Sequence, residues 1–245
     1  MKPSDHSLEQ RSVPEQIRRM FDAIAPTYDF LNHLMSFGLD HRWRRKAIRL
    51  FGAKRGGVFL DIAAGSGDVS FDLMELRPQR IVGIDFAPGM LDVFRGKLSR
   101  CNHSSPVDIV SGDALSLPFR NESFDGTIVA FGIRNFADRS RALTEMFRVL
   151  KPGGISVILE CTKPDAPVIS QLYATYSRWG VPLLGSLISK HKSAYAYLPD
   201  SISHFPSTEE FLSLMEHAGF AEPRETALSF GAATIFTGRK LPATE

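Results

Sequence analysis

Cysteine and long apolar segments are scarce in this sequence. Its two cysteines, Cys101 and Cys161, are too few and too far apart to form a disulfide framework or a zinc cluster. No apolar run approaches the roughly 20 residues that a membrane-spanning helix needs, and residues 1–10 lack the apolar core of a signal peptide. We therefore expect a cytoplasmic protein that is soluble, or at most peripheral at the inner face of a membrane.

Neither sign of charge is in excess, and metal ligands do not cluster. The 29 basic and 27 acidic residues nearly cancel, so bulk charge does not favour a nucleic-acid partner. The seven histidines show no metal-ligand spacing, and no metal is predicted. A chain of 245 residues can bury a sizeable core and suits one α/β domain with extensions.

Hydrophobic patterns divide this single predicted domain into four parts. A helical pattern over 11–52 predicts an N-terminal cap, after polar residues 1–10 that we expect to fray. Residues 56–161 alternate five strand signals with helices, which predicts a parallel sheet. Residues 162–206 form an aromatic-rich insertion, interpreted either as a lid or as packing on the sheet. A C-terminal helix and two strands are expected in 207–240.

The most informative segment runs from Val58 to Asp68 and reads VFLDIAAGSGD. It is an apolar strand with Asp61 near its carboxyl end, followed by a turn of small residues and a helical pattern. Gly65 and Gly67 let the backbone turn sharply and approach a ligand that a Cβ would exclude. The helix behind the turn presents unpaired N–H groups to that ligand.

Two later strands also end in an acid at the expected edge of the sheet. The second strand ends at Asp85, 18 residues after Gly67, and doubly wound nucleotide-binding domains place a ribose-binding carboxylate at similar spacing. The third strand leads into Asp113 and Ala114. Ligands bind at this edge in open α/β sheets, so we expect the acids to surround a ligand.

The fourth strand is predicted to run from Phe124 to Ile133, FDGTIVAFGI, and to lead into a loop at the same edge. A helix over 142–150 and a turn over 151–154, Lys-Pro-Gly-Gly, are expected to follow it.

The glycine turn distinguishes between two cofactors. A dinucleotide-binding Gly-x-Gly-x-x-Gly motif would have its third glycine at position 70, where this chain has Ser70. Asp61 would also face a pyrophosphate unfavourably, whereas S-adenosylmethionine carries an ammonium, a sulfonium and no phosphate. The pattern therefore favours S-adenosylmethionine over NAD, with a nicotinamide oxidoreductase as the less supported alternative.

Nine segments spread over most of the chain match a family pattern: FDAIAPTYDFLNHLMSFGLDHRWR (21–44), DIAAGSGD (61–68), GIDFAPGML (83–91), GDALSLPF (112–119), FGIRNFADR (131–139), EMFRVLKPGG (145–154), LECTKPD (159–165), SAYAYLPDS (193–201) and FPSTEEFLSLMEHAGF (205–220). Through them the chain resembles the UbiE/MenG methyltransferases, which C-methylate the ring of ubiquinone or menaquinone precursors. The glycine and acid motifs alone specify only an S-adenosylmethionine fold. The FGIRN, YDFLN and AYAYLP-to-FP stretches make the resemblance specific.

The resemblance implies an α/β fold, the Rossmann-like class I methyltransferase fold. This fold has a mostly parallel sheet with helices on both faces, an N-terminal helical extension and a lid insertion before the last helix. The family pattern puts Ser66 on the cofactor, Asp85 on its ribose, and Asp113 with Ala114 beside adenine. It often has serine where this chain has Ala130. Together with the acid and glycines of the turn, the candidate cofactor-binding residues are Asp61, Gly65, Ser66, Gly67, Asp85, Asp113, Ala114 and Ala130.

The implied reaction is methylation of a ring carbon in a polyprenylated quinol. Demethylmenaquinol is the favoured substrate, and 2-methoxy-6-polyprenyl-1,4-benzoquinol is the other candidate. The family marks Arg134 and Asn135 as substrate-activating residues, because a guanidinium can stabilise the quinolate oxygen. Tyr28 is the third candidate catalytic residue, by contact with the ring or its oxygen. His33 and His191 are weaker proton acceptors, each without a partner readable in the sequence.

Other interpretations of these residues and of the whole chain remain open. Arg134 could form a surface ion pair, and Tyr28 could be a half-buried core residue. The basic run 41–46 is typical of a solvated helix face, but it also suits anionic lipid headgroups. The chain could methylate another apolar small molecule, or bind cofactor without catalysis in a quinone-synthesis complex. Homodimerisation is compatible with the sequence and is not predicted by any motif.

Overall fold

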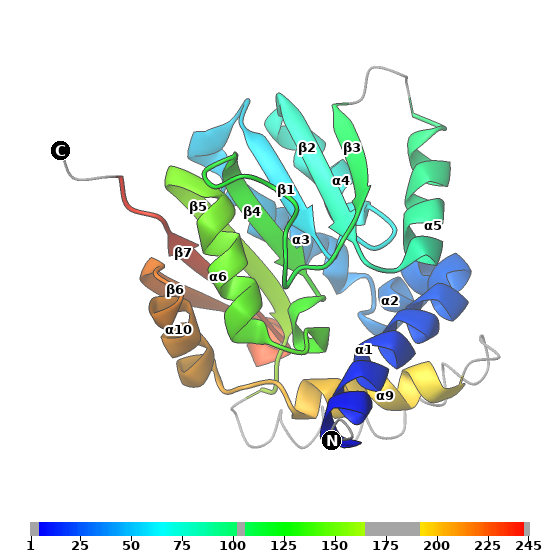
Figure 1. The fold of residues 1–245 in the computed structure, drawn as a ribbon. Coiled ribbons are helices and arrows are strands. Elements are labelled where there is room, and N and C mark those ends of the chain that lie inside the picture. The colour runs from blue at the N-terminus through cyan, green and yellow to red at the C-terminus, as the bar shows by residue number, and fades with distance from the viewer. Residues whose placement is uncertain (1–4, 102–105, 165–191, 243–245) are drawn as a thin grey trace.

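A seven-stranded sheet forms the centre of the fold in the computed structural model, which describes residues 5–101, 106–164 and 192–242 (Figure 1). Its strand order is β3-β2-β1-β4-β5-β7-β6. The first five strands in this order are parallel, whereas β7 is antiparallel to both β5 and β6. The strands are β1 (Val58–Ile62), β2 (Arg80–Asp85), β3 (Val107–Ser111), β4 (Phe124–Ala130), β5 (Leu150–Cys161), β6 (Ala221–Leu228) and β7 (Ala233–Arg239).

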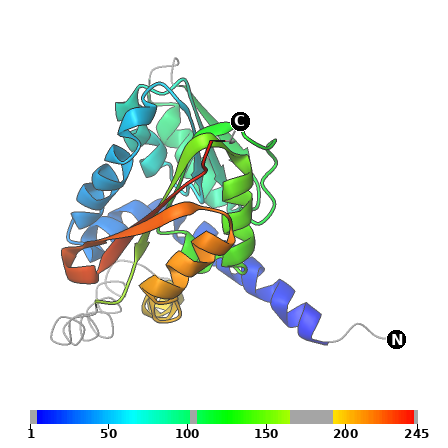
Figure 2. The same ribbon diagram turned by 90° about the vertical axis from the view of Figure 1, so that its left-hand side faces the viewer.

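Helices cover both faces of the sheet, as Figure 2 shows from its edge. The helices α3, α4 and α5 pack on one face, and α6 and α10 pack on the other. Parallel neighbours need such crossover connections, so the alternating pattern of the sequence correctly predicts the layers. The described helices are α1 (Asp5–Ile24), α2 (Tyr28–Met35), α3 (Leu39–Arg49), α4 (Asp68–Leu73), α5 (Pro88–Leu98), α6 (Arg139–Val149), α9 (Lys192–Ser203) and α10 (Thr208–His217).

Strand β1 illustrates why the central strands read as continuous apolar runs. Phe59 packs into the core on the α3–α5 side, while Leu60 and Ile62 pack on the α6–α10 side. All three side chains are almost completely buried. Because successive side chains point to opposite faces and both faces are covered, both sets of positions must be apolar.

The N-terminal cap lies across the carboxyl ends of the parallel strands. Figure 1 shows α1, α2 and α9 below that edge of the sheet. Helix α1 begins at Asp5, within the segment 1–10 that the sequence predicts to fray. A 3₁₀ turn with Pro26 at its start separates α1 from α2, since proline cannot continue the hydrogen bonding of a helix.

The connection from α6 to β5 differs from the expected one. Helix α6 starts at Arg139, earlier than expected, because the Asp138 carboxylate caps it by accepting a hydrogen bond from the Arg141 N–H at 2.9 Å. Strand β5 starts at Leu150, and the expected turn over 151–154 lies within its irregular first part: Leu150 pairs with Phe124 but Ile155 with Gly126, and Gly153 has a φ of +76°. Strand β4 ends at Ala130, shorter than expected.

The insertion over 162–206 is only partly described. Helix α9 lies within it and contacts α1 and the loop after β4. Most of the apolar and aromatic residues from which a lid was inferred fall in 165–191, outside the described residues. Among the residues that the structure describes, no helix is long and apolar enough to cross a membrane.

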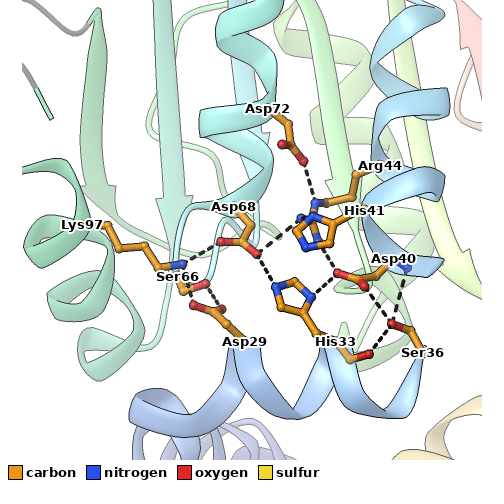
Figure 3. Close-up of polar contacts among 10 residues, drawn as sticks. All are labelled: Asp29, His33, Ser36, Asp40, His41, Arg44, Ser66, Asp68, Asp72 and Lys97. Carbon is orange, nitrogen blue, oxygen red and sulfur yellow. Dashed lines mark hydrogen bonds and ion pairs between the residues drawn. The ribbon is translucent and has the colours of Figure 1, made fainter. Parts of the chain in front are cut away.

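A buried arginine joins the cap to the sheet domain (Figure 3). Arg44 of α3 is 5% exposed, and its guanidinium donates to Asp40 Oδ2 and to Asp72 Oδ2 of α4, each at 2.7 Å. Asp40 is itself 3% exposed. The basic run 41–46 is therefore not a uniformly solvated face, although its neighbour Arg45 is exposed. Removing one partner of a buried pair leaves an uncompensated charge, which is strongly destabilising.

We expect Arg44→Met to lower the free energy of unfolding by about 3–5 kcal/mol, because Asp40 would stay buried without its cation. The matched control is Arg45→Met, since Arg45 is exposed and its nearest contact with Glu75 is 4.0 Å. That variant should change the free energy by less than about 0.5 kcal/mol. Urea denaturation measures both, and equal, small effects would contradict a structural role for Arg44.

Candidate active site

A large cavity of about 330 Å³ opens at the carboxyl edge of the parallel strands. Its walls come from the ends of β1, β2 and β4, from the loop after β3, and from α1 and α2 of the cap. Among the lining residues are Phe21, Tyr28, Gly65, Asp85, Asp113 and Asn135. The edge predicted from the sequence is thus where the cavity lies, and the cap supplies one of its walls.

Close packing explains the glycines of the turn between β1 and α4. Gly65 and Gly67 have φ angles of +55° and +90°, a conformation that other residues rarely adopt. A Cβ on Gly67 would lie 2.2 Å from the Phe94 ring. The turn can therefore approach both α5 and the cavity only with glycine at this position.

Strained backbone occurs at two strand ends beside this cavity. Ala63, directly after β1, has a φ of +54°, and Phe131, directly after β4, has a φ of +59°. Both residues line the cavity. Left-handed conformations cost energy for residues other than glycine and cluster at functional sites, so their position supports a ligand-binding role for this edge.

Asp85 is held rigidly on the cavity wall. Its carboxylate accepts hydrogen bonds from the N–H groups of Gly65 and Ala87, each at 2.8 Å, and it is 7% exposed. Burial raises its pKa, while these backbone hydrogen bonds oppose the rise. The same carboxylate thus shapes the glycine turn and offers its remaining lone pairs to a ligand.

Asp61 lies behind the turn, and it does not line the described cavities. It is 1% exposed; Oδ2 accepts a hydrogen bond from the Ser70 hydroxyl at 2.6 Å, while Oδ1 has no described partner. Burial raises its pKa to about 7, and the nearby Asp85 adds to the rise. Ser70 therefore does what glycine could not at this position, because its hydroxyl satisfies a buried acid.

Three more of the expected residues lie at the large cavity. Asp113, Ala114 and Ala130 all line it. The Asp113 carboxylate accepts a hydrogen bond from the Leu115 N–H at 2.9 Å, so the loop after β3 is locally ordered by its own side chain. Ala130 presents no polar side chain there, as its methyl group dictates.

Ser66 lines a second, smaller cavity of about 50 Å³ beside the turn, together with Tyr28, Asp29 and Arg44. The Ser66 hydroxyl donates to the Asp29 carboxylate. Lys97 of α5 reaches into the same network, with its ammonium 2.5 Å from Asp29 Oδ2 (Figure 3). The cap helix α2 is thereby tied to the turn that the sequence singled out.

The other contact of Lys97 extends this network to α4. Its ammonium lies 2.6 Å from Asp68 Oδ1, so two carboxylates from different elements hold one ammonium group. Asp68 also lines the second cavity. Asp29 and Asp68 are therefore close enough together to bind one ammonium group between them.

A third cavity of about 40 Å³ lies under α1, α2 and α9. Its polar lining residues are Tyr28, Asn32, Arg134 and Tyr197, and its other walls include apolar residues such as Met20 and Leu31. Tyr28 lines all three cavities, so they meet at its side chain. Burial raises the pKa of its phenol, although Arg134 and Asn32 oppose the rise.

Arg134 forms a buried ion pair that the sequence did not predict. Its Nη1 donates to Glu160 Oε1 and to the Phe131 carbonyl, each at 2.6 Å. The guanidinium is 7% exposed and the Glu160 side chain 0%. The alternative of a surface ion pair is therefore wrong. Burial alone would lower the Arg134 pKa, but Glu160, together with Cys161 and Tyr28, outweighs burial and raises the pKa.

Asn135 is connected to α9 by a side-chain hydrogen bond. The Tyr197 hydroxyl donates to Asn135 Oδ1 at 3.0 Å. Asn135 lines the large cavity, whereas its neighbour Arg134 lines the third one. The adjacent residues of the FGIRN segment thus face different cavities, both of which Tyr28 lines.

Of the two histidines considered as proton acceptors, only His33 is described. Its Nδ1 lies 2.6 Å from Asp40 Oδ2, and its ring stacks on His41. These three residues bring possible metal ligands within 4.8 Å of one another. The Arg44 guanidinium on Asp40, however, already supplies positive charge to the cluster. His191 lies outside the described residues.

Several site residues could be identified only in three dimensions. Glu160, Tyr197 and Lys97 come from β5, α9 and α5, far in sequence from the groups that they contact. The one available signal was an acid in the apolar strand of the LECTKPD segment, where an unpaired charge would be costly.

Comparison with known proteins gives consistent matches. The ubiE/COQ5 methyltransferase family model matches residues 8–240. The ubiquinone/menaquinone biosynthesis C-methyltransferase UbiE of Geobacter sulfurreducens is 44% identical over 228 residues, 92% of this chain and 89% of the relative. The demethylmenaquinone methyltransferase of Bacteroides fragilis is 43% identical over 227 residues, 92% of this chain and 93% of the relative.

Solved structures agree at the level of the fold. A SAM-dependent methyltransferase from Aquifex aeolicus aligns with a TM-score of 0.60 and 17% identity, covering 81% of this chain and 89% of that one. The expected class I methyltransferase fold is thereby confirmed, with its mostly parallel sheet and N-terminal helices.

Asp61 should make stability depend on pH. Its pKa is raised from 3.8 in the unfolded chain to about 7, so folding retains a proton that the unfolded chain loses. The free energy of unfolding of the wild type should therefore fall by about 1.4 kcal/mol per pH unit between about pH 4 and pH 7 from this group. Asp61→Asn should remove this pH dependence, so the free energy of unfolding of the variant should rise relative to that of the wild type as pH rises.

Chemical denaturation across this pH range measures the effect. Asp108→Asn is the control, since Asp108 is 52% exposed in its pair with Arg80. Parallel pH profiles for wild type and Asp61→Asn would mean that Asp61 ionises normally in the folded protein.

Proposed function

The chain belongs to the ubiE/COQ5 methyltransferase family, and from this premise we propose that it transfers a methyl group from S-adenosylmethionine to a ring carbon of a polyprenylated quinol. The observation that carries the proposal is the meeting of three cavities at Tyr28. One has a fixed carboxylate, Asp85, and another has a buried guanidinium, Arg134. A cofactor and an acceptor ring could thus approach each other at a single point.

Demethylmenaquinol is the acceptor that we favour within this proposal. The Bacteroides fragilis relative carries the name demethylmenaquinone methyltransferase, and so does one from Thermus thermophilus that is 44% identical over 220 residues. The Geobacter relative is named for both ubiquinone and menaquinone biosynthesis. A benzoquinol acceptor therefore remains the second candidate.

The large cavity fits the adenosine part of the cofactor. Its volume of about 330 Å³ is within the range of small-molecule sites. We assign the ribose hydroxyls to Asp85, whose backbone hydrogen bonds fix it at the end of β2, and the adenine to Asp113 and Ala114 in the next loop. The cofactor supplies an electrophilic methyl group on a sulfonium, and the chain has only to orient it.

The second cavity fits the amino-acid end of the cofactor. Asp29 and Asp68 already hold the ammonium of Lys97 at 2.5 and 2.6 Å, so this pair of acids suits an α-ammonium group. Arg44 lines the same cavity and can face a carboxylate. The Ser66 hydroxyl, bound to Asp29, connects this end with the glycine turn.

The third cavity, of about 40 Å³, is too small for the whole acceptor ring, but its polar groups suit the ring oxygen. A phenolic hydroxyl of pKa ~10 costs roughly 4 kcal/mol to ionise at neutral pH, and ionisation makes the neighbouring carbon a good nucleophile. We assign stabilisation of this oxygen to Arg134, with Tyr28 and Asn135 beside it. The Glu160 partner raises the Arg134 pKa, so Arg134 stays protonated and the quinol proton leaves through water.

Cofactor binding can be tested with two ligands that differ in one end. S-adenosylhomocysteine carries the ammonium and carboxylate, whereas 5′-methylthioadenosine lacks them. We expect Asp29→Asn to weaken the binding of S-adenosylhomocysteine by about tenfold or more, the equivalent of one charge-assisted hydrogen bond. It should weaken the binding of 5′-methylthioadenosine by less than about twofold. Asp85→Ala should weaken both, because both contain the ribose.

Isothermal titration calorimetry measures these affinities, with Asp92→Asn on the exposed side of α5 as the control. Equal losses for both ligands in Asp29→Asn would refute the assignment of the second cavity. If the wild type binds neither ligand but binds NAD, the oxidoreductase alternative is favoured.

Turnover can be tested with labelled S-adenosylmethionine and both reduced demethyl-quinones. We expect methylation of the naphthoquinol, and a loss of about 100- to 1,000-fold in kcat for Arg134→Ala, because a charge stabiliser of the transition state is removed. Arg134→Lys should recover only part of the rate, and higher pH should partly rescue Arg134→Ala.

The control for this experiment is Arg148→Lys, which alters another arginine–glutamate pair on α6, with Glu145, away from the three cavities. Near-normal turnover in a folded Arg134→Ala would mean that ring activation happens elsewhere. Cofactor binding without any methylation of either quinol would favour another acceptor or a non-catalytic subunit.

A further inference from the structure

Glu160 is the most completely buried acid near the proposed acceptor site. It lies in β5, next to the last residue of the strand, with 0% exposure. Its Oε1 accepts hydrogen bonds from Arg134 Nη1 at 2.6 Å and from the Cys161 N–H at 2.8 Å. Its Oε2 accepts a third from the backbone N–H of Arg134 at 3.1 Å. One carboxylate therefore binds both the main chain and the side chain of the same arginine.

These contacts leave one part of the Arg134 guanidinium unused. Its Nη1 is occupied by Glu160 and by the Phe131 carbonyl, whereas its Nε is buried without a hydrogen-bond partner among the described residues. Nη2 also has no hydrogen bond among the described residues and, unlike Nε, it is not enclosed, so Nη2 is the nitrogen that can contact a ligand. Arg134 lines the third cavity, where the acceptor oxygen is proposed to bind.

We propose that Glu160 is a positioning residue that fixes the guanidinium plane of Arg134, directs the free Nη2 N–H groups to the acceptor oxygen, and limits the positive charge at that oxygen. The inference rests on the proposed function, since it concerns the same acceptor. It adds Glu160 to the proposed acceptor site, so the group that faces the quinol is a neutralised arginine–glutamate pair and not an isolated cation.

The charge balance has a consequence for the acceptor. Arg134 alone would favour the ionised quinol strongly, and Glu160 opposes this by its own negative charge. Removing the charge of Glu160, with its shape retained, should therefore lower the pKa of the bound quinol. The rate would then reach its plateau at a lower pH.

The surrounding ionisable groups do not obscure this effect. The groups that face the pair are Tyr28 from α2, Cys161 from β5, Arg139 from α6 and Tyr197 from α9. Burial raises the pKa of Cys161 to about 12, and it also raises the pKa of both tyrosines. These three groups stay protonated in a pH series from about 6 to 9. Asp61 titrates near 7, but it does so equally in wild type and variant.

The test compares kcat against pH for wild type and Glu160→Gln, at saturating cofactor and demethylmenaquinol. We expect the profile of the variant to move to lower pH by on the order of one unit, the effect of one nearby charge in a partly screened site. A merely structural Glu160 would instead lower the rate equally at every pH and leave the profile in place. Circular dichroism and denaturation verify that the variant is folded.

Glu145→Gln is the matched control, because Glu145 is another buried acid with an arginine partner, Arg148, at 2.7 Å. It should lose stability without moving the pH profile. Glu160→Asp is the second variant: it keeps the charge but draws the carboxylate back by one methylene. It should lower kcat with an unchanged pH profile and a nearly unchanged KM for cofactor, because the direction of Arg134 is lost.

The outcomes separate the inference from the function on which it rests. Active wild type with an unshifted Glu160→Gln profile overturns the role of the charge. Full activity of Glu160→Asp overturns the positioning role, and this variant decides the question if Glu160→Gln does not fold. No methylation of either quinol by the wild type overturns the proposed function itself.

Discussion

The buried ion network of Arg44 is the interaction on which the arrangement of the site depends. It joins Asp40 of α3 to Asp72 of α4, and Asp40 also contacts His33 of α2, so the network links α2 to the helices on the sheet. Because the charges are almost fully withdrawn from water, each needs its partner, and the network is far more costly to break than a surface pair. Tyr28 and Asp29 sit on the same helix α2, and the contacts of Asp29 with Ser66 and Lys97 also hold this helix beside the cavities. The wall that α2 contributes to the cavities therefore depends in part on ion pairs of Arg44, which lie away from the proposed acceptor site.

Charge compensation is the common theme of the buried acids. Asp61 relies on the Ser70 hydroxyl and on a raised pKa, whereas Glu160 relies on Arg134. These are the two ways in which a protein can bury a carboxylate: it can favour the neutral form or supply a cation. The first solution couples the glycine turn to pH, and the second places a neutralised pair beside the proposed acceptor.

Elements distant in sequence meet at the three cavities. The cap contributes Tyr28 and Asn32, the loop after β4 contributes Arg134 and Asn135, and α9 contributes Tyr197. The hydrogen bond from Tyr197 to Asn135 makes α9 part of the site wall, which gives the aromatic insertion a chemical role at its described end. Few, well-fixed polar groups in an apolar lining are typical of small-molecule sites, and this is the composition of the third cavity.

The sequence by itself determined the sheet, its helices, and the edge at which Gly65, Asp85 and Asp113 gather. Hydrophobic period and turn chemistry are local, and the ends of parallel strands share one edge by topology. Its motifs also identified the family. Only the tertiary structure decided which charges are buried and paired. Arg44 is buried although its segment resembles a solvated helix face, and Asp61 is buried behind the glycine turn. Arg134 forms its ion pair with Glu160. The ends of some elements also differ from those predicted from the sequence, as at the start of α6 (Arg139) and of β5 (Leu150). The physical reason is that the partner of a buried charge is chosen by packing between distant elements, and no local pattern records that choice.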